Sequence, residues 1–364
     1  MTMWICQPRD TLVIRDGRPM ADGAGVAVSL DQPWPTTIAG LCRTRIGLQQ
    51  GGGVFKLSRG EALAIEARGP WWVTLNARGE EQELWVPAPA DAVWHRTSQG
   101  AADLTRTRLV LAGADPAMDS NLPAGLQFVL PAAELPEGKG VAGPALWKWS
   151  AMRNWLVAPA SQSAIQPESV GMGRPLHEAR IHVGIDAQTQ TADDGKLFEI
   201  DHVRPQVDFG GRAVDLALAF ICDHPDLRPG VVPLGGERRL SSLRQGKIAA
   251  PTLDFRPDGR LLRVVLLTPG LFGKGYRPDV GGLGDGVRVV AAAVGRPMTV
   301  SGWDFERKAP KAARWAAPAG SVYWLEFPDE AAAHKWAQAN WWRPISDDEQ
   351  DRRDGFGVCA VGVA

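Results

Sequence analysis

The chain has 364 residues and a formal net charge of -1 at pH 7. Its length predicts two domains of ordinary size, and its 45% hydrophobic content indicates a packed globular protein rather than a disordered one. A near-neutral charge does not favour tight, free-standing binding of nucleic acid, so any polyanion contact must come from local basic clusters, glycine-loop amides or a larger assembly.

The first predicted element is a strand at MWICQP, and the residues around it carry neither the basic nor the apolar region of a signal peptide. A helix is predicted over PTTIAGLCRTRIGLQQ, with Thr36 or Thr37 as its N-cap and glycines ending it. One face of this helix is apolar. The opposite face holds small residues and one arginine, spaced by four, three and four: Thr36, Gly40, Arg43 and Gly47. We expect a backbone or a phosphate chain to be able to lie close against that face.

The middle of the chain is rich in proline and glycine, with predicted strands at WWVTLN and ELWVPAP and a predicted helix over LWKWSAMRNWLV. A long hairpin is predicted at 179–203. Its two alternating segments, Ile181–Ile185 and Leu197–Val203, flank a polar turn with Asp193, Asp194 and Gly195. VDLALAFICD is a further predicted strand, and the basic loop VPLGGERRLSSLRQGK follows it.

The C-terminal third repeats strands around one clear helix. LLRVVLLT, VRVVAAAVG, SVYWLEF and GFGVCAVGVA are predicted strands, and DEAAAHKWAQANWW is a predicted helix with Asp329 and Glu330 at its positive end. The order strand, crossover, strand, strand, helix, strand is typical of a ferredoxin-like domain. The crossover at Pro269–Gly286 is rich in glycine, which argues against a regular helix there.

Hydropathy and cysteine spacing both favour a cytoplasmic protein without a membrane partner. No apolar run is long enough to span a bilayer. The four cysteines form no CxxC pair, so buried reduced thiols are favoured over two disulfides. The 15 tryptophans are interpreted mainly as core and interdomain packing, with a platform for stacking bases or docking a partner as the alternative.

Familiar catalytic and cofactor motifs are missing. There is no P-loop, GxSxG, HExxH or strand-linked GxGxxG. The six histidines show no metal-ligand spacing, and they are His95, His177, His182, His202, His224 and His334. Asp193 and Asp194 are interpreted as solvated turn residues rather than as a carboxylate pair for a metal. We therefore expect no catalytic and no metal-binding residues.

Glycine loops beside basic side chains remain as the candidate chemistry. Exposed amides with arginine forks hold phosphates, and an aromatic between them can stack a base. The segment WDFERKAPKAAR concentrates further positive charge at Arg307, Lys308, Lys311 and Arg314. The residues predicted to bind RNA from the helix face and these loops are Gly40, Arg43, Gly235, Gly236, Arg238, Arg239, Gly273, Lys274 and Gly275.

Several of these segments resemble the third subunit of the type III-B CRISPR Cmr complex, a member of the repeat-associated mysterious protein (RAMP) group. RIHVGIDAQTQTADDGKLFE resembles the motif I-D-x-x-T-x-x-A-x-x-G-x-L-F shared by several RAMP subunits. DTLVIRDGRPM, PTTIAGLCRTRI, PLGGERR, LLTPGLFGKGYRP, the stretch 301–324 and the final GFGVCAVG follow in the order expected of the family. The resemblance covers nearly the whole chain. Aromatics would be expected at Ile14 and Met20, where this sequence departs from the pattern.

The resemblance implies an α+β fold of two ferredoxin-like (RRM-like, RAMP) domains with hairpin and loop insertions. The division is placed at residues 1–220, with the hairpin 179–203 inserted, and 221–364. It also implies that the glycine loop at Gly355, Phe356 and Gly357 lets RNA backbone approach the protein. The resemblance further implies that the protein has no cofactor and no catalytic activity. The subunit would hold the repeat-derived 5′ tag of the guide RNA (crRNA) and join the large polymerase/cyclase-like subunit to a neighbouring backbone RAMP subunit.

Two alternatives stay open. The first is a RAMP-type RNA endonuclease, since some relatives cut RNA, and Asp22 and Asp31 lie in the loop before the first helix, where one relative carries its aspartate. The second is the tag-binding subunit of another type III complex or a purely structural adaptor. RNA that copurifies with the protein, and the sequence of its 5′ end, would separate these alternatives.

Overall fold

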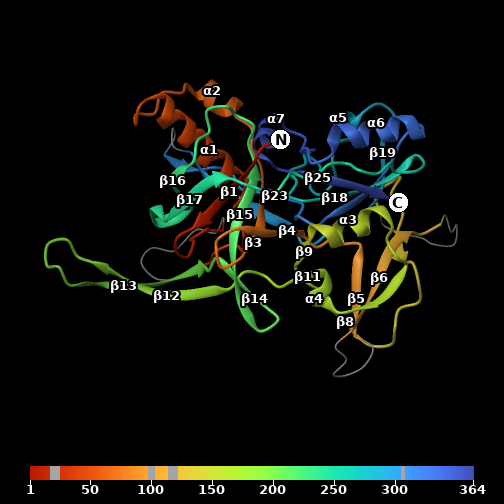
Figure 1. The fold of residues 1–364 in the computed structure, drawn as a ribbon, viewed down its shortest axis with the longest axis horizontal. Coiled ribbons are helices and arrows are strands. Elements are labelled where there is room, and N and C mark those ends of the chain that lie inside the picture. Colours follow the sequence, from red (N-terminus) through yellow and green to blue (C-terminus); the bar gives the residue numbers. More distant parts are fainter. Residues whose placement is uncertain (17–24, 97–102, 114–121, 305–307) are drawn as a thin grey trace.

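The structure is a computed structural model that describes residues 1–16, 25–96, 103–113, 122–304 and 308–364. Antiparallel sheets make up most of it, and a smaller number of helices lie against them (Figure 1). The chain is therefore an α+β protein, as the sequence predicts. No helix in these ranges is both long and apolar enough to cross a membrane.

The largest sheet has nine strands and contains the first strand of the chain near its centre. Along the sheet the order is β11 (Gly171–Met172), β9 (Leu146–Lys148), β4 (Glu81–Pro87), β3 (Arg68–Leu75), β15 (Arg212–Ile221), β1 (Met3–Pro8), β17 (Leu240–Gln245) and β16 (Gly230–Pro233), with β14 (Gln206–Phe209) paired to β15. Because β17 pairs with β1, this sheet extends past residue 220.

A second, four-stranded sheet is built from the C-terminal third. Its order is β19 (Arg288–Ala293), β24 (Val322–Glu326), β18 (Leu261–Leu266) and β25 (Cys359–Val363). Every neighbouring pair in it is antiparallel. β18 is central and buried along nearly its whole length, which agrees with its almost unbroken apolar sequence.

The two sheets pack face to face because successive side chains of a strand point to opposite faces. On β1, Met3 and Ile5 face a core shared with Val264 of the second sheet. Trp4 and Cys6 point the other way, into a core covered by the apolar stripe of α1 (Pro35–Gln50). The large sheet is therefore buried on both faces, and the second sheet and α1 cover them.

Smaller sheets extend the body. One holds β10 (Gln162–Ile165), β6 (Leu104–Leu111), β5 (Ala92–His95) and β8 (Gly140–Val141), with β7 (Val129–Pro131) on β6. Another holds β12 (His177–Ile185), β13 (Ala192–Val203) and β2 (Gly25–Ala27). Two strand pairs remain: β20 (Met298–Val300) with β23 (Arg314–Ala316), and β21 (Trp303–Asp304) with β22 (Ala309–Pro310). The hairpin β12–β13 projects from the body at the left of Figure 1.

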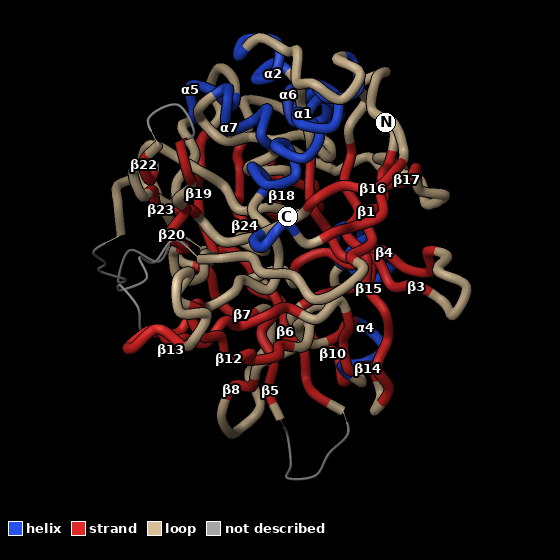
Figure 2. Tube along the Cα trace, turned by 90° about the vertical axis from the view of Figure 1, so that its left-hand side faces the viewer, coloured by secondary structure: helices blue, strands red, loops and turns tan. Residues whose placement is uncertain are grey.

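Helices gather at one end of the molecule, opposite the β5–β6–β8 sheet (Figure 2). Besides α1, they are α2 (Arg59–Ala64), α5 (Val280–Leu283), α6 (Glu330–Asn340) and α7 (Glu349–Asp354). Elsewhere lie α3 (Trp149–Val157), which packs against β25 and β4, α4 (Pro167–Val170), which packs against β11, and a short 3-10 turn at Gly236–Arg238. Asp329 caps α6 by accepting a hydrogen bond from the amide of Ala332, as its position in the sequence suggests.

Three local expectations are wrong, each for a physical reason. α1 begins at Pro35 with Trp34 as N-cap, because proline at the first helical position is already set to a helical φ. α3 begins only at Trp149, because the preceding residues pair as β9. The hairpin turns at 186–191, where Asp186 accepts hydrogen bonds from the amides of Gln188 and Thr189, so Asp193–Gly195 lie inside β13.

Candidate nucleic-acid interface

The glycine loop near the end of the chain is packed against the protein itself. α7 ends at Gly355, whose φ of 94° is the left-handed conformation typical of a glycine C-cap. A Cβ at Gly355 would lie 2.6 Å from the carbonyl oxygen of Ala67, and one at Gly357 would lie 2.7 Å from Oγ of Ser346. Phe356 between them is fully buried. The close approach that these glycines permit is made by neighbouring segments of the same chain.

Arg43 reaches from α1 to the helix that leads into this loop. Its guanidinium lies 2.6 Å from Oδ1 of Asp354 and also donates to the carbonyl of Ile65 at 3.1 Å. Both side chains of the ion pair are mostly buried. Gly40, one turn earlier, has open space where a Cβ would be. The structure thus brings Arg43 to the C-terminal end of α7, next to Gly355, and Asp354 engages Arg43 there.

The basic loop at 235–239 lies on another part of the large sheet and packs against Val13. Gly235 has a φ of 76°, and the amide of Gly236 donates to the carbonyl of Val13 at 2.7 Å. Arg239 forms ion pairs with Asp10 and Glu237. Arg238 is exposed, and no hydrogen bond or ion pair to another described residue engages it. Arg238 is therefore the cation that this loop presents to solvent.

The loop at 273–275 is the most open of the predicted segments. Gly273 donates its amide to Oδ2 of Asp347 at 2.7 Å, and Lys274 pairs with Asp279 at 3.2 Å. Gly275 has a φ of 78°, and a Cβ added to it would meet no atom within 4 Å. Its amide donates to the carbonyl of Phe272 at 3.1 Å. The next residue, Tyr276, is exposed.

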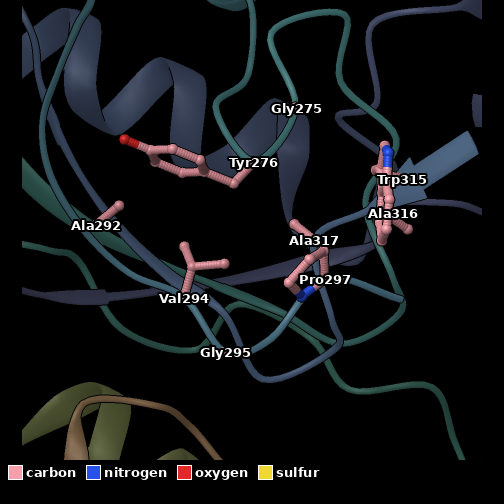
Figure 3. A pocket seen from close by; sticks show the side chains of 9 residues that line it. All are labelled: Gly275, Tyr276, Ala292, Val294, Gly295, Pro297, Trp315, Ala316 and Ala317. Atoms are coloured by element: carbon pink, nitrogen blue, oxygen red, sulfur yellow. The ribbon is translucent and has the colours of Figure 1, made fainter. Parts of the chain in front are cut away.

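An apolar hollow of about 450 Å³ opens beside this loop. Figure 3 shows Tyr276 on one side and Trp315 on the other, with Val294 and Pro297 below. Trp315 is 63% exposed, whereas the other tryptophans whose side chains the structure describes are buried or half-buried. Two exposed aromatic rings at one apolar hollow can stack unpaired bases.

A second hollow joins this region to α7. Gly273, Gly275 and Trp315 line it from one side, and Asp347 and Asp351 line it from the other. Arg314, next to Trp315, holds Asp351 through two hydrogen bonds of 2.7 and 2.8 Å. These hydrogen bonds raise the pKa of Arg314, so the guanidinium stays charged at this surface.

The sequence did not single out Trp315, because the tryptophans were interpreted together, mainly as core and interdomain packing. The adjacent pair Trp71–Trp72 is core, as are Trp341 and Trp342. The signal available was local: Trp315 follows Arg314 in a basic segment without other large apolar residues nearby. Of the other residues singled out there, Met20, Asp22 and Arg307 lie outside the described residues.

Asp31, the described aspartate before α1, sits in a cluster of charged groups. Its Oδ1 lies 2.9 Å from Nε2 of His177 and its Oδ2 lies 2.8 Å from Arg174. Nδ1 of His177 lies 2.7 Å from Oδ2 of Asp201. Partial burial disfavours charge on the imidazole, but the hydrogen bonds to Asp201 and Asp31 outweigh it and raise the pKa of His177.

Comparison with known proteins places this α+β molecule among the CRISPR-associated proteins. The family profile described as CRISPR-associated protein (Cas_Cmr3) matches residues 4–364. The chain belongs to this family, and the resemblance to the third subunit of the Cmr complex is confirmed.

Two of the solved structures similar to the chain are chains of the type III-B Cmr-beta complex. One is a chain of the type III-B Cmr-beta complex bound to cognate target RNA and AMPPnP, with 14% identity, coverage of 88% of this chain and 86% of that chain, and a TM-score of 0.47. Another, from Cmr-beta bound to cognate target RNA, has 16% identity, the same two coverages and a TM-score of 0.46. A comparison with curated protein sequences gave no match.

Proposed function

We propose that this chain is a non-catalytic, guide-RNA-binding subunit of a type III-B Cmr complex. It holds the 5′ repeat-derived tag of the guide and joins the large polymerase/cyclase-like subunit to a backbone RAMP subunit. Membership of the Cas_Cmr3 family supports the assignment to a Cmr complex. The observation that carries RNA binding is the exposed Trp315, which lines an apolar hollow together with the exposed Tyr276 and with Gly275.

The chemistry of this surface suits a short single-stranded RNA segment. Trp315 and Tyr276 offer rings on which bases stack, and stacking is worth about 1–3 kcal/mol per base. The exposed Arg296, which lies between Gly295 and Pro297 at the hollow, can meet phosphate oxygens. With a net charge of -1, the isolated subunit binds RNA weakly, and binding strengthens when neighbouring subunits share the RNA.

Strand order supports two ferredoxin-like units. In the second sheet the strands β18, β19, β24 and β25 lie in the order 4-1-3-2, counted along the chain. The large sheet contains the same order in β1, β3, β15 and β17. We place the division after Gln245, because β17 completes the first set, rather than at residue 220. In the first unit, β16 and a 3-10 turn stand where the second helix of such a domain would be.

We propose that the chain is non-catalytic because the charged groups around Asp31 already bind one another. Both ring nitrogens of His177 bind carboxylates, so neither is free to carry a proton to or from RNA. Both oxygens of Asp31 are occupied as well. An RNA endonuclease that used Asp31 would first have to break these contacts. Incubation of the complex with RNA and Mg²⁺ tests this point: cleavage that disappears in Asp31→Ala or Asp22→Ala would establish the endonuclease alternative.

The tag assignment is tested by crosslinking guide RNA inside the assembled complex. We expect crosslinks from the 5′ tag to residues around Trp315, and we expect Trp315→Ala to remove them and weaken guide binding by about 1–3 kcal/mol. Phe55→Ala is the matched control, because Phe55 is an exposed aromatic beyond the end of α1. Crosslinks that fall along the guide segment and never at the tag would replace this proposal with a backbone-subunit role.

A further inference from the structure

Three residues from distant parts of the chain meet where the hairpin joins the body. His182 lies on β12, His202 lies on β13, and Glu237 lies in the 235–239 loop. One nitrogen of each histidine and one carboxylate oxygen of Glu237 all lie within 4.8 Å of one another. Spacings of 20 and 35 residues gave no motif, because hairpin pairing and packing of the loop bring the three together.

The two imidazoles have unsatisfied nitrogen atoms. Nε2 of His182 and Nε2 of His202 are both buried and have no hydrogen-bond partner in the described part of the chain. The whole side chain of His202 is fully buried. A buried polar atom without a partner costs roughly 1–3 kcal/mol, so native proteins usually provide one. A bound cation would satisfy both nitrogens at once.

The ring of His202 is oriented as that of a metal ligand is. Its Nδ1 lies 2.9 Å from Oγ1 of Thr11, which leaves Nε2 as the free nitrogen. Metal-binding histidines almost always use their other ring nitrogen for a hydrogen bond of this kind.

Glu237 completes the set with a carboxylate. Arg239 binds only its Oε2, so the contacts leave Oε1 available. Glu237 has a φ of 54°, an uncommon conformation for a residue other than glycine, and such strain concentrates at functional sites. The charges nearby are nearly balanced, because Asp10 and Glu178 pair with Arg239 and Arg180.

We propose that His182, His202 and Glu237 bind a divalent transition metal, of which Zn²⁺ fits the donor set. Two imidazole nitrogens and one carboxylate, with water as a fourth ligand, form a common zinc coordination set at about 2.0–2.2 Å per bond. The two rings lie nearly parallel, with centroids 6.0 Å apart and an interplanar angle of 1°, so one ring must rotate about its χ2 for both lone pairs to point at one ion. The ion would fasten the projecting hairpin to the loop that carries Arg238.

Zn²⁺ binding to the full-length protein tests the site directly. After dialysis against a chelator, isothermal titration is expected to give one Zn²⁺ per chain, and Zn²⁺ is expected to raise the melting temperature. His182→Ala and Glu237→Gln are expected to weaken this binding by at least about tenfold, and Thr11→Val by about 10–100-fold through loss of ring orientation. His334→Gln is the matched control, because His334 lies on α6 away from the cluster.

Two readouts keep the test decisive if a variant folds poorly. The titration of the wild-type protein needs no variant, and Glu237 is exposed, so Glu237→Gln leaves the core untouched. Co²⁺ gives a visible spectrum that reports nitrogen and oxygen coordination and must change in Glu237→Gln. Failure of the wild-type protein to bind Zn²⁺, or equal binding by wild type, His182→Ala and Glu237→Gln, overturns the proposal.

Discussion

Replacing Arg43 by alanine separates an internal role of this side chain from a direct contact with RNA. Arg43 and Asp354 lie 2.6 Å apart with side chains only 12% and 11% exposed. An exposed ion pair contributes about 0–1 kcal/mol, whereas removing one partner of a buried pair costs about 3–5 kcal/mol. The small residual exposure places Arg43→Ala between these limits, at about 2–3 kcal/mol of unfolding free energy.

Urea unfolding followed by tryptophan fluorescence measures this cost in the wild type, Arg43→Ala, Asp354→Ala and the double variant. We expect the double variant to cost less than the sum of the single ones, with a coupling of about 1–2 kcal/mol, because each single change strands a charge. Thr44→Ala is the control, since Thr44 is the exposed neighbour on the same helix. If Arg43→Ala weakened guide binding but left stability unchanged, the ion pair would not be formed and Arg43 would contact RNA.

Three further predictions concern other contacts. Arg263→Met leaves the fully buried Asp91 without its charge partner and should lower the unfolding free energy by about 3–5 kcal/mol. The double variant Arg263→Met, Asp91→Leu should recover part of this lost free energy. If urea unfolding showed that the losses of the two single variants add up in the double variant, the pairing would be contradicted. Because the pKa of His177 is raised, protonated His177 should stabilise the fold fully at pH values below about 6.5, the ordinary histidine pKa, and this stabilisation should be lost as the pH rises through the raised pKa. If the difference in unfolding free energy between the wild type and His177→Gln did not change between about pH 5.5 and 8, this prediction would be refuted. Gly275→Ala should cost roughly 1 kcal/mol of unfolding free energy, because alanine is strained in the left-handed conformation. Gly357→Ala should cost more, because its Cβ would also collide with Ser346. Equal melting temperatures of the two variants would contradict the packing of Gly357 against Ser346.

Local sequence patterns predicted the elements whose own residues determine them. β18 and α6 follow from an apolar run and from a capped amphipathic segment, and β1 and β3 were found in the same way. The α+β class and the family follow from such segments taken in order. Strand order in the large sheet could not be predicted this way, because β1 pairs with strands more than 200 residues away.

The candidate site was harder to predict, because contacts across the chain decide what each loop offers. Gly275 and Gly357 have similar sequence surroundings, yet one faces open space and the other faces Ser346. Trp315 and Trp324 are both large aromatics in short strands, yet only Trp315 is exposed. The hairpin turns at 186–191 rather than at the predicted 193–195, because the side chain of Asp186 accepts hydrogen bonds from two amides. These contacts outweigh Gly195 as a turn signal.

The ion pair between Arg43 and Asp354 joins residues that are 311 positions apart in the chain. Contacts of such separation require closure of a very long loop, whose entropic cost must be met before the contact forms. α1 can lie on its sheet early in folding, but its attachment to α7 must await the second sheet. The first unit therefore reaches its final stability only after the second has folded, so folding of this chain is expected to be slow and ordered from one unit to the other.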